Sequence, residues 1–463
     1  MENLEKQTIS QYDEMTTRPV SKLLLKLSVP AIISMMITNL YNIVDTAFVG
    51  LLGTSESGAT GVVFSFMSIL QAVAFMCGQG SGSILARRLG NKDEKTATQS
   101  ASTGFFLSFG LGLLISIITF IFMDPILWVL GSTATIYPFA KIYITYIALA
   151  APFFTSSLTL NNILRYEGKA KLGTVGMTAG AILNVGLDAL FIFPFKMGIS
   201  GAALATAISQ IVSFSILLCM FIFGKTKTRI SFKYFSTAKL LPLNILATGF
   251  PSCLRQALTS VSSMLLNQCA RVYGDAAVSA FSCVSKISFF SMAIAIGIGQ
   301  GFQPICSFNY GANKKDRVKK AFFGSICAEL TVLFVLSIPM FIFAPQLIML
   351  MRNDPAVIEI GVRALQLTCI SSLFLPLGMM TEMGFQSIGS KILATACSSL
   401  RSGVVLIPTL LILANTRGLA GIQEAQPLAV IIASLISLLF IKAFLKKLKP
   451  DTISDQIQTS TAK

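Results

Sequence analysis

Twelve apolar segments, separated by short polar loops, run along the chain between residues 28 and 444. Each exceeds the roughly 20 residues that a helix needs to cross the hydrocarbon of a bilayer. They are apolar all round rather than along one stripe, which is typical of membrane helices and not of a soluble helical repeat. We therefore predict an all-α membrane protein with twelve transmembrane helices, at residues 28–50, 58–82, 99–122, 138–161, 172–193, 199–223, 241–269, 276–303, 321–344, 360–386, 391–414 and 421–444.

The composition and the placement of charge agree with this layout. Hydrophobic residues make up 54% of the 463 residues and charged residues only 12%, against about 25% charged in soluble proteins. Lys and Arg gather in alternate loops, while the loops on the opposite side hold only Lys196, Arg271, Arg352 and Arg417. The positive-inside rule then predicts a multi-pass protein of the inner (cytoplasmic) membrane with both termini cytoplasmic. The net charge of +16 reflects topology and contact with the lipid bilayer, and we expect no nucleic-acid partner.

The residues that most enzymes and metal sites require are scarce. The chain has no His, and its nine Cys include no CxxC pair. Since His is the commonest general base and metal ligand, we expect no enzyme, no catalytic residues, no bound cofactor and no structural metal.

An internal repeat relates the two halves of the chain by one constant offset, the distance in sequence from Pro30 to Pro251. Prolines, glycines and a glutamine recur at this offset, in the pairs Pro30/Pro251, Gly78/Gly299, Gln79/Gln300, Gly80/Gly301, Gly90/Gly311 and Gly168/Gly389. Six helices separate the copies, so both halves have the same orientation, and a substrate path between them suits such repeats. We predict a cytoplasmic tail at 1–22, an N-lobe at 23–223, a cytoplasmic linker at 224–240, a C-lobe at 241–445 and a second cytoplasmic tail at 446–463.

Three segments resemble the multidrug and toxic compound extrusion (MATE) family. They are VPAIISMMITNLYNIVDTAFVG (29–50), NNILRYEGKAK (161–171) and GQGFQPICSFNYGANKKDRVKKA (299–321), and the resemblance extends over residues 20–445. It implies the MATE fold of two six-helix lobes. It also implies an antiporter that exports drugs and organic cations in exchange for Na⁺ or H⁺. The same superfamily contains flippases of lipid-linked saccharides.

Four polar residues of the N-lobe are expected at one depth in the membrane. Asp45, Asn184, Asp188 and Thr206 would lie roughly 8–11 Å below the outer surface, from the rise per residue of a helix. Charges in hydrocarbon are costly and demand a partner or a role. The four could form an oxygen-lined Na⁺ site or a carboxyl pair that shares a proton, or the acids could merely cap helices near interfacial water. The family resemblance implies the coupling-ion site, because each residue matches a position of that site.

The C-lobe offers fewer acids. The seventh helix has none across Leu254–Cys269, where a branch of the family places a coupling Glu. Glu382 in the tenth helix is an alternative and a candidate for the substrate cavity. Lys286 and Glu329 lie near mid-membrane, and we predict a structural ion pair between them.

Other residues are candidates for motion and for substrate contact. Pro30 and Pro251 interrupt the main-chain hydrogen bonding of the first and seventh helices, and either allow bending and gating or fix a kink for packing. The resemblance implies that Asn161 and Met177 line the N-lobe cavity.

Together these features predict a multidrug efflux antiporter that works as a monomer. A lipid or lipid-linked saccharide flippase is the first alternative. A non-transporting membrane scaffold or receptor is the second, which the buried acids argue against. Carboxylate and amide oxygens serve Na⁺ and H⁺ alike, so the coupling ion stays open at this point.

Overall fold

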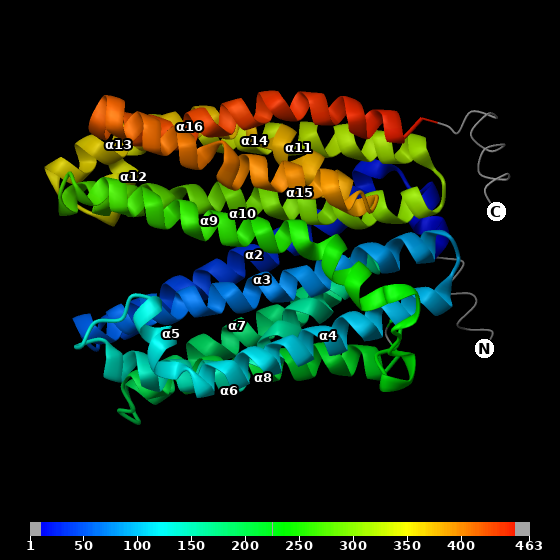
Figure 1. The fold of residues 1–463 in the computed structure, drawn as a ribbon, viewed down its shortest axis with the longest axis horizontal. Coiled ribbons are helices and arrows are strands. Elements are labelled where there is room, and N and C mark those ends of the chain that lie inside the picture. Colours follow the sequence, from blue (N-terminus) through cyan, green and yellow to red (C-terminus); the bar gives the residue numbers. More distant parts are fainter. Residues whose placement is uncertain (1–10, 225, 450–463) are drawn as a thin grey trace.

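The computed structural model describes residues 11–224 and 226–449, and Figure 1 shows two helical bundles side by side. The first bundle contains α2 (Val20–Gly50), α3 (Thr54–Gly90), α4 (Glu94–Ile121), α5 (Met123–Val129), α6 (Tyr137–Tyr166), α7 (Ala170–Ile192) and α8 (Ile199–Ile222). A connecting segment holds two 3₁₀ turns, η1 (Phe232–Tyr234) and η2 (Ala238–Leu240). The second bundle contains α9 (Leu241–Arg271), α10 (Asp275–Gly311), α11 (Lys315–Ile342), α12 (Ala344–Met351), α13 (Pro355–Ser372), α14 (Leu375–Ser387), α15 (Lys391–Ser399), the π turn η3 (Leu400–Val404) and α16 (Leu406–Lys447).

The prediction of twelve spans is confirmed by these elements. Nine helices of the described chain are long and apolar enough to cross a membrane, and α13 with α14, bent by 52°, makes a tenth. The stretch Lys391–Lys447 counts as one of the nine, yet its 57 residues would measure about 85 Å if straight, twice the thickness of a bilayer. It holds two spans, because Gly418 is non-helical (φ 61°, ψ −134°) and the chain reverses there (Figure 1). The twelfth span is α9, which lies alongside the others.

Several predicted boundaries were wrong. The helices α3 and α10 continue to Gly90 and Gly311, well beyond residues 82 and 303, because the glycine-rich stretches pack against the other bundle instead of ending the helix. The tenth span is broken between Ser372 and Leu375 rather than continuous. The short helices α5 and α12 were not predicted at all.

The internal repeat is visible in the backbone. Gly168 and Gly389, which the repeat relates to each other, have φ values of +80° and +81°. Lys92 and Asn313, at the same offset, have φ values of +59° and +57°, an uncommon conformation for residues with a side chain. The two halves therefore share turn geometry as well as sequence.

The bundles join at one end only. One cluster of buried hydrophobic residues contains members of both bundles, such as Leu85 and Phe302, and lies toward the start of α2 and the end of α16. At the far end each bundle has its own cluster, around Phe66 in the first and Phe281 in the second. Figure 1 accordingly shows the bundles meeting at the end where α2 begins and α16 ends, and diverging toward the other. We call these the closed end and the far end.

Glycines let the helix backbones touch across the closed end. The contacts run between α3 and α9 and between α2 and α10. A Cβ atom placed on Gly80 would lie 3.0 Å from the backbone nitrogen of Gly249, and one placed on Gly301 would lie 2.6 Å from that of Ser28. Because Ser28 and Gly249 are themselves related by the repeat, as Gly80 and Gly301 are, both contacts are built in the same way.

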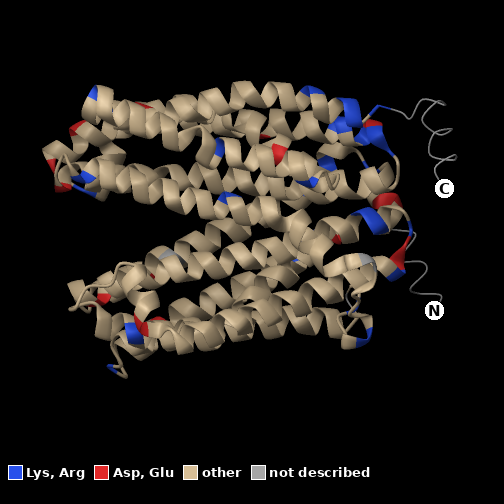
Figure 2. Ribbon diagram, in the orientation of Figure 1, with Lys and Arg blue, Asp and Glu red and all other residues tan. Residues whose placement is uncertain are grey.

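Charged residues lie mainly at the two ends of the helices. Figure 2 shows Lys and Arg concentrated at the closed end and few charges along the middle of the helices. Lys141 and Arg363 add to the basic residues expected at the far end, where they pair with Asp124 and Glu424. The few charges that lie within the helices are therefore candidates for a functional role.

Candidate ion-binding site

Three helices of the first bundle bring the predicted ion-site residues together. Asp45 lies on α2, Asn184 and Asp188 on α7, and Thr206 on α8. Asn184 and Asp188 are four residues apart and share one face of α7. Since α7 packs against both α2 and α8, this face lies against the other two helices.

The side chains form one polar cluster. Asn184 Nδ2 donates a hydrogen bond to Thr206 Oγ1 at 3.2 Å. Tyr143, on α6, donates its hydroxyl hydrogen to Asp45 Oδ2 at 3.5 Å. The carboxyl groups of Asp45 and Asp188 are neighbours in this cluster. All four predicted residues therefore belong to the cluster.

The oxygen atoms of this cluster have unused hydrogen-bonding capacity. Asp188 is completely buried, and Asn184 and Thr206 are nearly so. Among the described residues, neither oxygen of Asp188, nor Asp45 Oδ1, nor Asn184 Oδ1 accepts a hydrogen bond. Buried polar atoms normally have a partner, and a buried carboxylate without one is unstable. Four such oxygens in one place point to a bound cation or proton.

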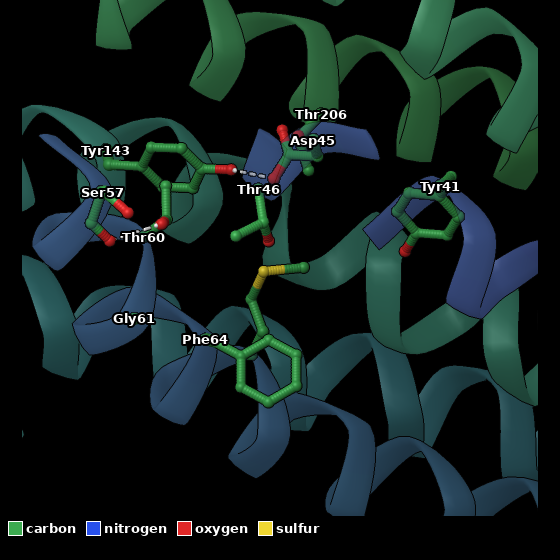
Figure 3. Close-up of a pocket in the computed structure, with 10 residues that line it drawn as sticks. Tyr41, Asp45, Thr46, Ser57, Thr60, Gly61, Phe64, Tyr143 and Thr206 are labelled. Carbon is green, nitrogen blue, oxygen red and sulfur yellow. Dashed lines mark hydrogen bonds between the residues drawn. The ribbon is translucent and has the colours of Figure 1, made fainter. Parts of the chain in front are cut away.

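A cavity of about 270 Å³ gives access to one side of the cluster. Asp45, Thr206, Tyr41 and Tyr143 line it, together with residues of α3 such as Phe64 (Figure 3). The cavity lies toward the far end, because Asp45 is near the end of α2 and the lining part of α3 is its first third. An ion can thus approach the carboxyl pair from the far end of the molecule.

Two tyrosines of the site were missed by the sequence analysis. Tyr41 precedes Asp45 by four residues on α2, and this spacing places both on one helix face, so the signal was available. Nothing in the sequence links Tyr143 to Asp45, because the contact depends on the tertiary arrangement of α6 and α2, which are far apart in the chain.

The predicted substrate-contact residues lie in three different surroundings. Asn161 packs against α7, where its Oδ1 occupies the space beside Gly173. Met177 lies inside the first bundle, and its sulfur accepts hydrogen bonds from Ser157 and Ser213. Glu382 is in the second bundle and is only 1% exposed. None of the three predicted residues lines the cavity beside Asp45, and their contact with a substrate stays a prediction.

The predicted ion pair between Lys286 and Glu329 is also wrong. Lys286 is exposed on α10, whereas Glu329 is completely buried on α11. No salt bridge joins them within the described residues; the charged neighbour of Glu329 is Arg401. Equal depth in the membrane was not sufficient, because the two side chains leave their helices in different directions.

Pro30 and Pro251 both lie inside long helices, as predicted. The carbonyl oxygen of Pro30 accepts a hydrogen bond from Thr174 at 2.9 Å, and that of Pro251 accepts one from Ser398 at 2.6 Å. Each proline is thus tied to a helix of its own bundle, α7 or α15. Their role in gating stays a prediction.

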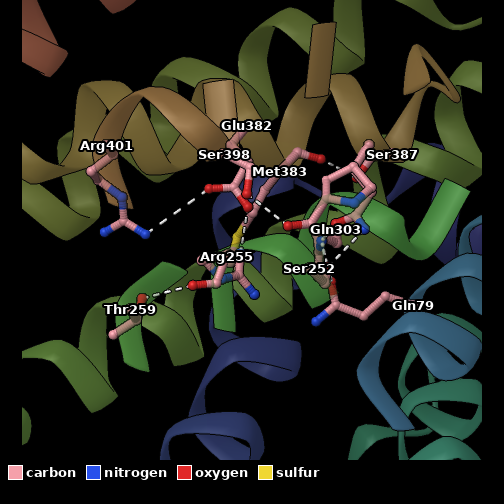
Figure 4. Close-up of polar contacts among 12 residues, drawn as sticks. Gln79, Ser252, Arg255, Thr259, Gln303, Glu382, Met383, Ser387, Ser398 and Arg401 are labelled. Carbon is pink, nitrogen blue, oxygen red and sulfur yellow. Dashed lines mark hydrogen bonds and ion pairs between the residues drawn. The ribbon is translucent and has the colours of Figure 1, made fainter. Parts of the chain in front are cut away.

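A polar network closes the space between the bundles at mid-height. Ser252 donates to Gln79 Oε1 at 2.6 Å, Gln303 donates to Gln386 at 3.0 Å, and Gln386 donates to Ser252 at 2.8 Å (Figure 4). Arg165 of the first bundle donates to Gln300 of the second. Among the described residues, the hydrogen bonds between the bundles begin at the closed end. The one nearest to the far end joins Gln71 and Gln256, which lie at the midpoints of α3 and α9.

Two helical lobes of equal orientation, joined at one end and carrying a pair of carboxyl groups near the other, are the architecture of a membrane transporter. Comparison with known proteins gives its family. The MatE family model matches residues 30–190 and 251–412, so its two matches begin at the repeat-related prolines Pro30 and Pro251. The chain belongs to the MATE family.

Relatives of known name cover almost the whole chain. The multidrug export protein MepA of Staphylococcus saprophyticus is 27% identical over 433 residues, which span 93% of this chain and 96% of that protein. MepA of Staphylococcus aureus strain N315 is 27% identical over 439 residues, spanning 94% and 96%.

Solved structures share the fold. A MOP superfamily transporter from Pyrococcus furiosus superposes with a TM-score of 0.89 at 25% identity, covering 94% of this chain and 98% of that one. An outward-facing structure of a multidrug resistance MATE family transporter superposes with the same score, identity and coverage. The MATE-type fold is thereby confirmed.

Proposed function

We propose that this protein is a multidrug efflux antiporter that exports amphipathic, mainly cationic compounds in exchange for Na⁺ or H⁺. The observation that carries the proposal is the pair formed by half-buried Asp45 and buried Asp188, in which three of the four carboxyl oxygens accept no hydrogen bond from a described residue although the pair lies beside a cavity. The family supports it, since relatives that cover the chain end to end are named multidrug export proteins.

We place the closed end, and with it both termini, in the cytoplasm. The basic residues concentrated there support this orientation through the positive-inside rule. The cavity beside Asp45 then faces the outside, where the external ion enters. The divergence of the lobes at the far end corresponds to an outward-facing conformation.

The exchange follows from competition between ion and substrate. A Na⁺ or H⁺ ion bound at Asp45 and Asp188 lowers the negative charge of the carboxyl pair by one unit, which weakens the attraction of the N-lobe for an organic cation. The substrate leaves to the outside, and the loaded lobe then closes the far end while the closed end opens. Residues 23–223 and 241–445 are the moving units in this scheme, and one chain contains the whole pathway, so a monomer suffices.

The linker at 224–240 is fastened to the N-lobe. The Glu167 carboxylate, buried at the end of α6, accepts hydrogen bonds from the backbone N–H groups of Lys227 at 2.6 Å and Thr228 at 2.8 Å. Ser102 of α4 donates to the carbonyl oxygen of Arg229 at 2.8 Å. In our scheme the linker therefore moves with the N-lobe, and the hinge lies between it and α9.

Efflux of a fluorescent cationic dye from cells that lack their own pumps tests the function. Wild type should lower dye accumulation, and Asp188→Asn should return it to the level of empty vector. Asp124→Asn is the matched control, because Asp124 is an exposed acid at the far end of the same lobe. Removal of Na⁺ or collapse of the proton gradient identifies the coupling ion. Absence of efflux from correctly inserted wild-type protein would refute the exporter, and accumulated envelope precursors in a deletion strain would then favour a flippase.

A further inference from the structure

Two buried glutamates and two partly buried arginines lie within the C-lobe, away from the N-lobe ion site. They are Arg255 on α9, Glu329 on α11, Glu382 on α14 and Arg401 on the π turn η3. Figure 4 shows Arg255 and Arg401 reaching toward Glu382 from two different helices. Charges at such positions are costly unless they are paired or have a role.

One pair in this group is complete. Arg255 Nη1 donates to Glu382 Oε1 at 2.6 Å, and the side chains are 14% and 1% exposed. Arg255 lies on α9, which packs against α3 of the N-lobe, and the next residue, Gln256, bonds to Gln71. Glu382 therefore already has its counter-ion within the protein.

Glu329 is left without such a partner. It is 0% exposed, and neither of its carboxylate oxygens accepts a hydrogen bond from a described residue. Its charged neighbour, Arg401, lies with Nη2 4.0 Å from Glu382 Oε2, too far for a hydrogen bond, and has no partner at Nε. Arg401 thus lies between two carboxyl groups and is hydrogen-bonded to neither.

The other helices around Glu329 supply no further counter-ion. The neighbours of α11 are α2, α10, α12, α13 and α14. Lys286 of α10 is exposed, Glu359 and Arg363 of α13 lie at the far end, α14 contributes Glu382, and the basic residues of α2 lie at the closed end. No charged residue occurs in α12. The charge on Glu329 is thus balanced by Arg401 or by a proton.

The backbone around Arg401 is unusual as well. It forms a π turn, Leu400–Val404, and single π turns within α-helices occur frequently at functional sites. The turn is held against α9, because Ser262 donates to the carbonyl oxygen of Ser402 at 2.7 Å. A shift of Arg401 can therefore reach α9, which carries Arg255 and packs against the N-lobe.

We propose that Glu329 is a second proton-binding site, located in the C-lobe and controlled by Arg401. With a proton on one oxygen, Glu329 is neutral and can lie buried without an ionic partner. The group formed by Arg255, Glu382 and Arg401 then carries one net positive charge. After the proton leaves, the Glu329 carboxylate attracts Arg401 and the four side chains sum to zero.

The consequence for transport rests on the proposed function. A net positive charge on this group of C-lobe side chains repels an organic cation in the space between the lobes. Loss of that charge favours binding of the cation. Proton uptake at Glu329 therefore adds to the effect of the N-lobe ion site and promotes release of the substrate. The proton-binding step itself requires no transport.

Infrared difference spectra of the purified, reconstituted protein test the site during a pH titration. Wild type should show the carbonyl stretch of a protonated buried carboxyl group, and Glu329→Gln should lack one component of that band. Glu359→Gln, an exposed residue of α13, should keep it. Glu329→Met is a second variant that removes the acid and leaves no buried amide. Because Asp45 and Asp188 contribute bands of their own, the difference from wild type is the decisive quantity, and an unchanged band in both Glu329 variants would overturn the proposal.

Proton release on binding of tetraphenylphosphonium connects the site to the substrate. For each cation that binds, Glu329→Gln should release about one proton fewer than wild type. Linkage requires this difference, because protonation of Glu329 opposes binding of the cation. Equal release from both proteins would refute the link to substrate. The two proposals fail separately. A missing carbonyl component with no dye efflux by wild type rejects only the exporter, whereas efflux with an unchanged band rejects only the role of Glu329.

Discussion

We expect Gly249→Ala to force the lobes apart at the closed end. A Cβ atom at position 249 would lie 2.5 Å from the backbone carbonyl carbon of Met76 on α3, and closer still to its oxygen. Ordinary van der Waals contact begins at 3.4 Å. Backbone atoms cannot rotate away as a side chain can, so α3 and α9 must separate by about 0.9 Å or more.

The cost follows from overpacking, which is typically about 1–3 kcal/mol for one added methyl group in a tightly packed contact. The strain acts between the lobes and not within either lobe, so it should shift the conformational equilibrium rather than unfold the protein. A shift of that size changes the ratio of two conformations, one with the lobes separated at the closed end and one with the lobes in contact there, by roughly 5–150-fold.

Spin labels at Lys95 and Lys320 can measure the shift in reconstituted protein, because both residues are exposed at the closed end of their lobes. Distance distributions should broaden and move to larger values in Gly249→Ala. Gly186→Ala is the control, since a Cβ atom at position 186 meets nothing within 4 Å. The reasoning is refuted if Gly249→Ala gives the wild-type distribution while its thermal stability is also unchanged.

Three further substitutions have defined expectations. Arg255→Met should destabilise the protein by about 3–5 kcal/mol in thermal unfolding, because it leaves the Glu382 carboxylate buried without its ionic partner. The double variant Arg255→Met/Glu382→Met should recover most of that loss, and additive losses from the two changes would contradict the expectation. Tyr143→Phe removes the hydrogen bond to Asp45 and should lower dye efflux several-fold at saturating ion. Its melting temperature should change no more than that of the control variant Tyr146→Phe. Arg317→Gln removes the bonds to the carbonyl oxygens of Met15 and Arg18. Backbone amides of residues 11–18 should then exchange hydrogen faster while those of α7 stay unchanged, and equal exchange in both proteins would show that this contact does not hold the segment.

The existence and approximate position of the spans could be predicted because the bilayer imposes them. A helix must bury about 20 apolar residues, and this requirement leaves a local signal that survives without tertiary information. The interruptions within the apolar segments were harder to predict. The tenth span is interrupted at Ser372–Leu375, and the chain reverses at Gly418 through a positive φ. Both features lie inside apolar sequence, where hydropathy does not change.

Residues predicted to lie together do so where residues of one lobe share a depth and a helix face. Asn184 and Asp188 satisfy both conditions, and they meet Asp45 and Thr206 as expected. Depth alone failed for Lys286 and Glu329, because it does not fix the direction in which a side chain leaves its helix. Arg401 could not be foreseen as the neighbour of Glu329, since the π turn that carries it has no signature in the sequence.

The repeat explains why the two lobes share a backbone but not a chemistry. Repeat-related positions keep the left-handed turns at Gly168 and Gly389 and the close helix contacts at Gly80 and Gly301. These features depend on the absence of a Cβ atom or on backbone conformation, and any substitution there disturbs the interface. Polar positions are free to diverge, because each needs only a partner within its own lobe. Asp45 and Asp188 correspond through the repeat to Leu266 and Thr409, and Glu382 corresponds to Asn161. An unpaired carboxyl pair in one lobe and a largely self-neutralised charge group in the other are thus compatible with one symmetric scaffold, and this asymmetry lets the two lobes respond differently to the same ion.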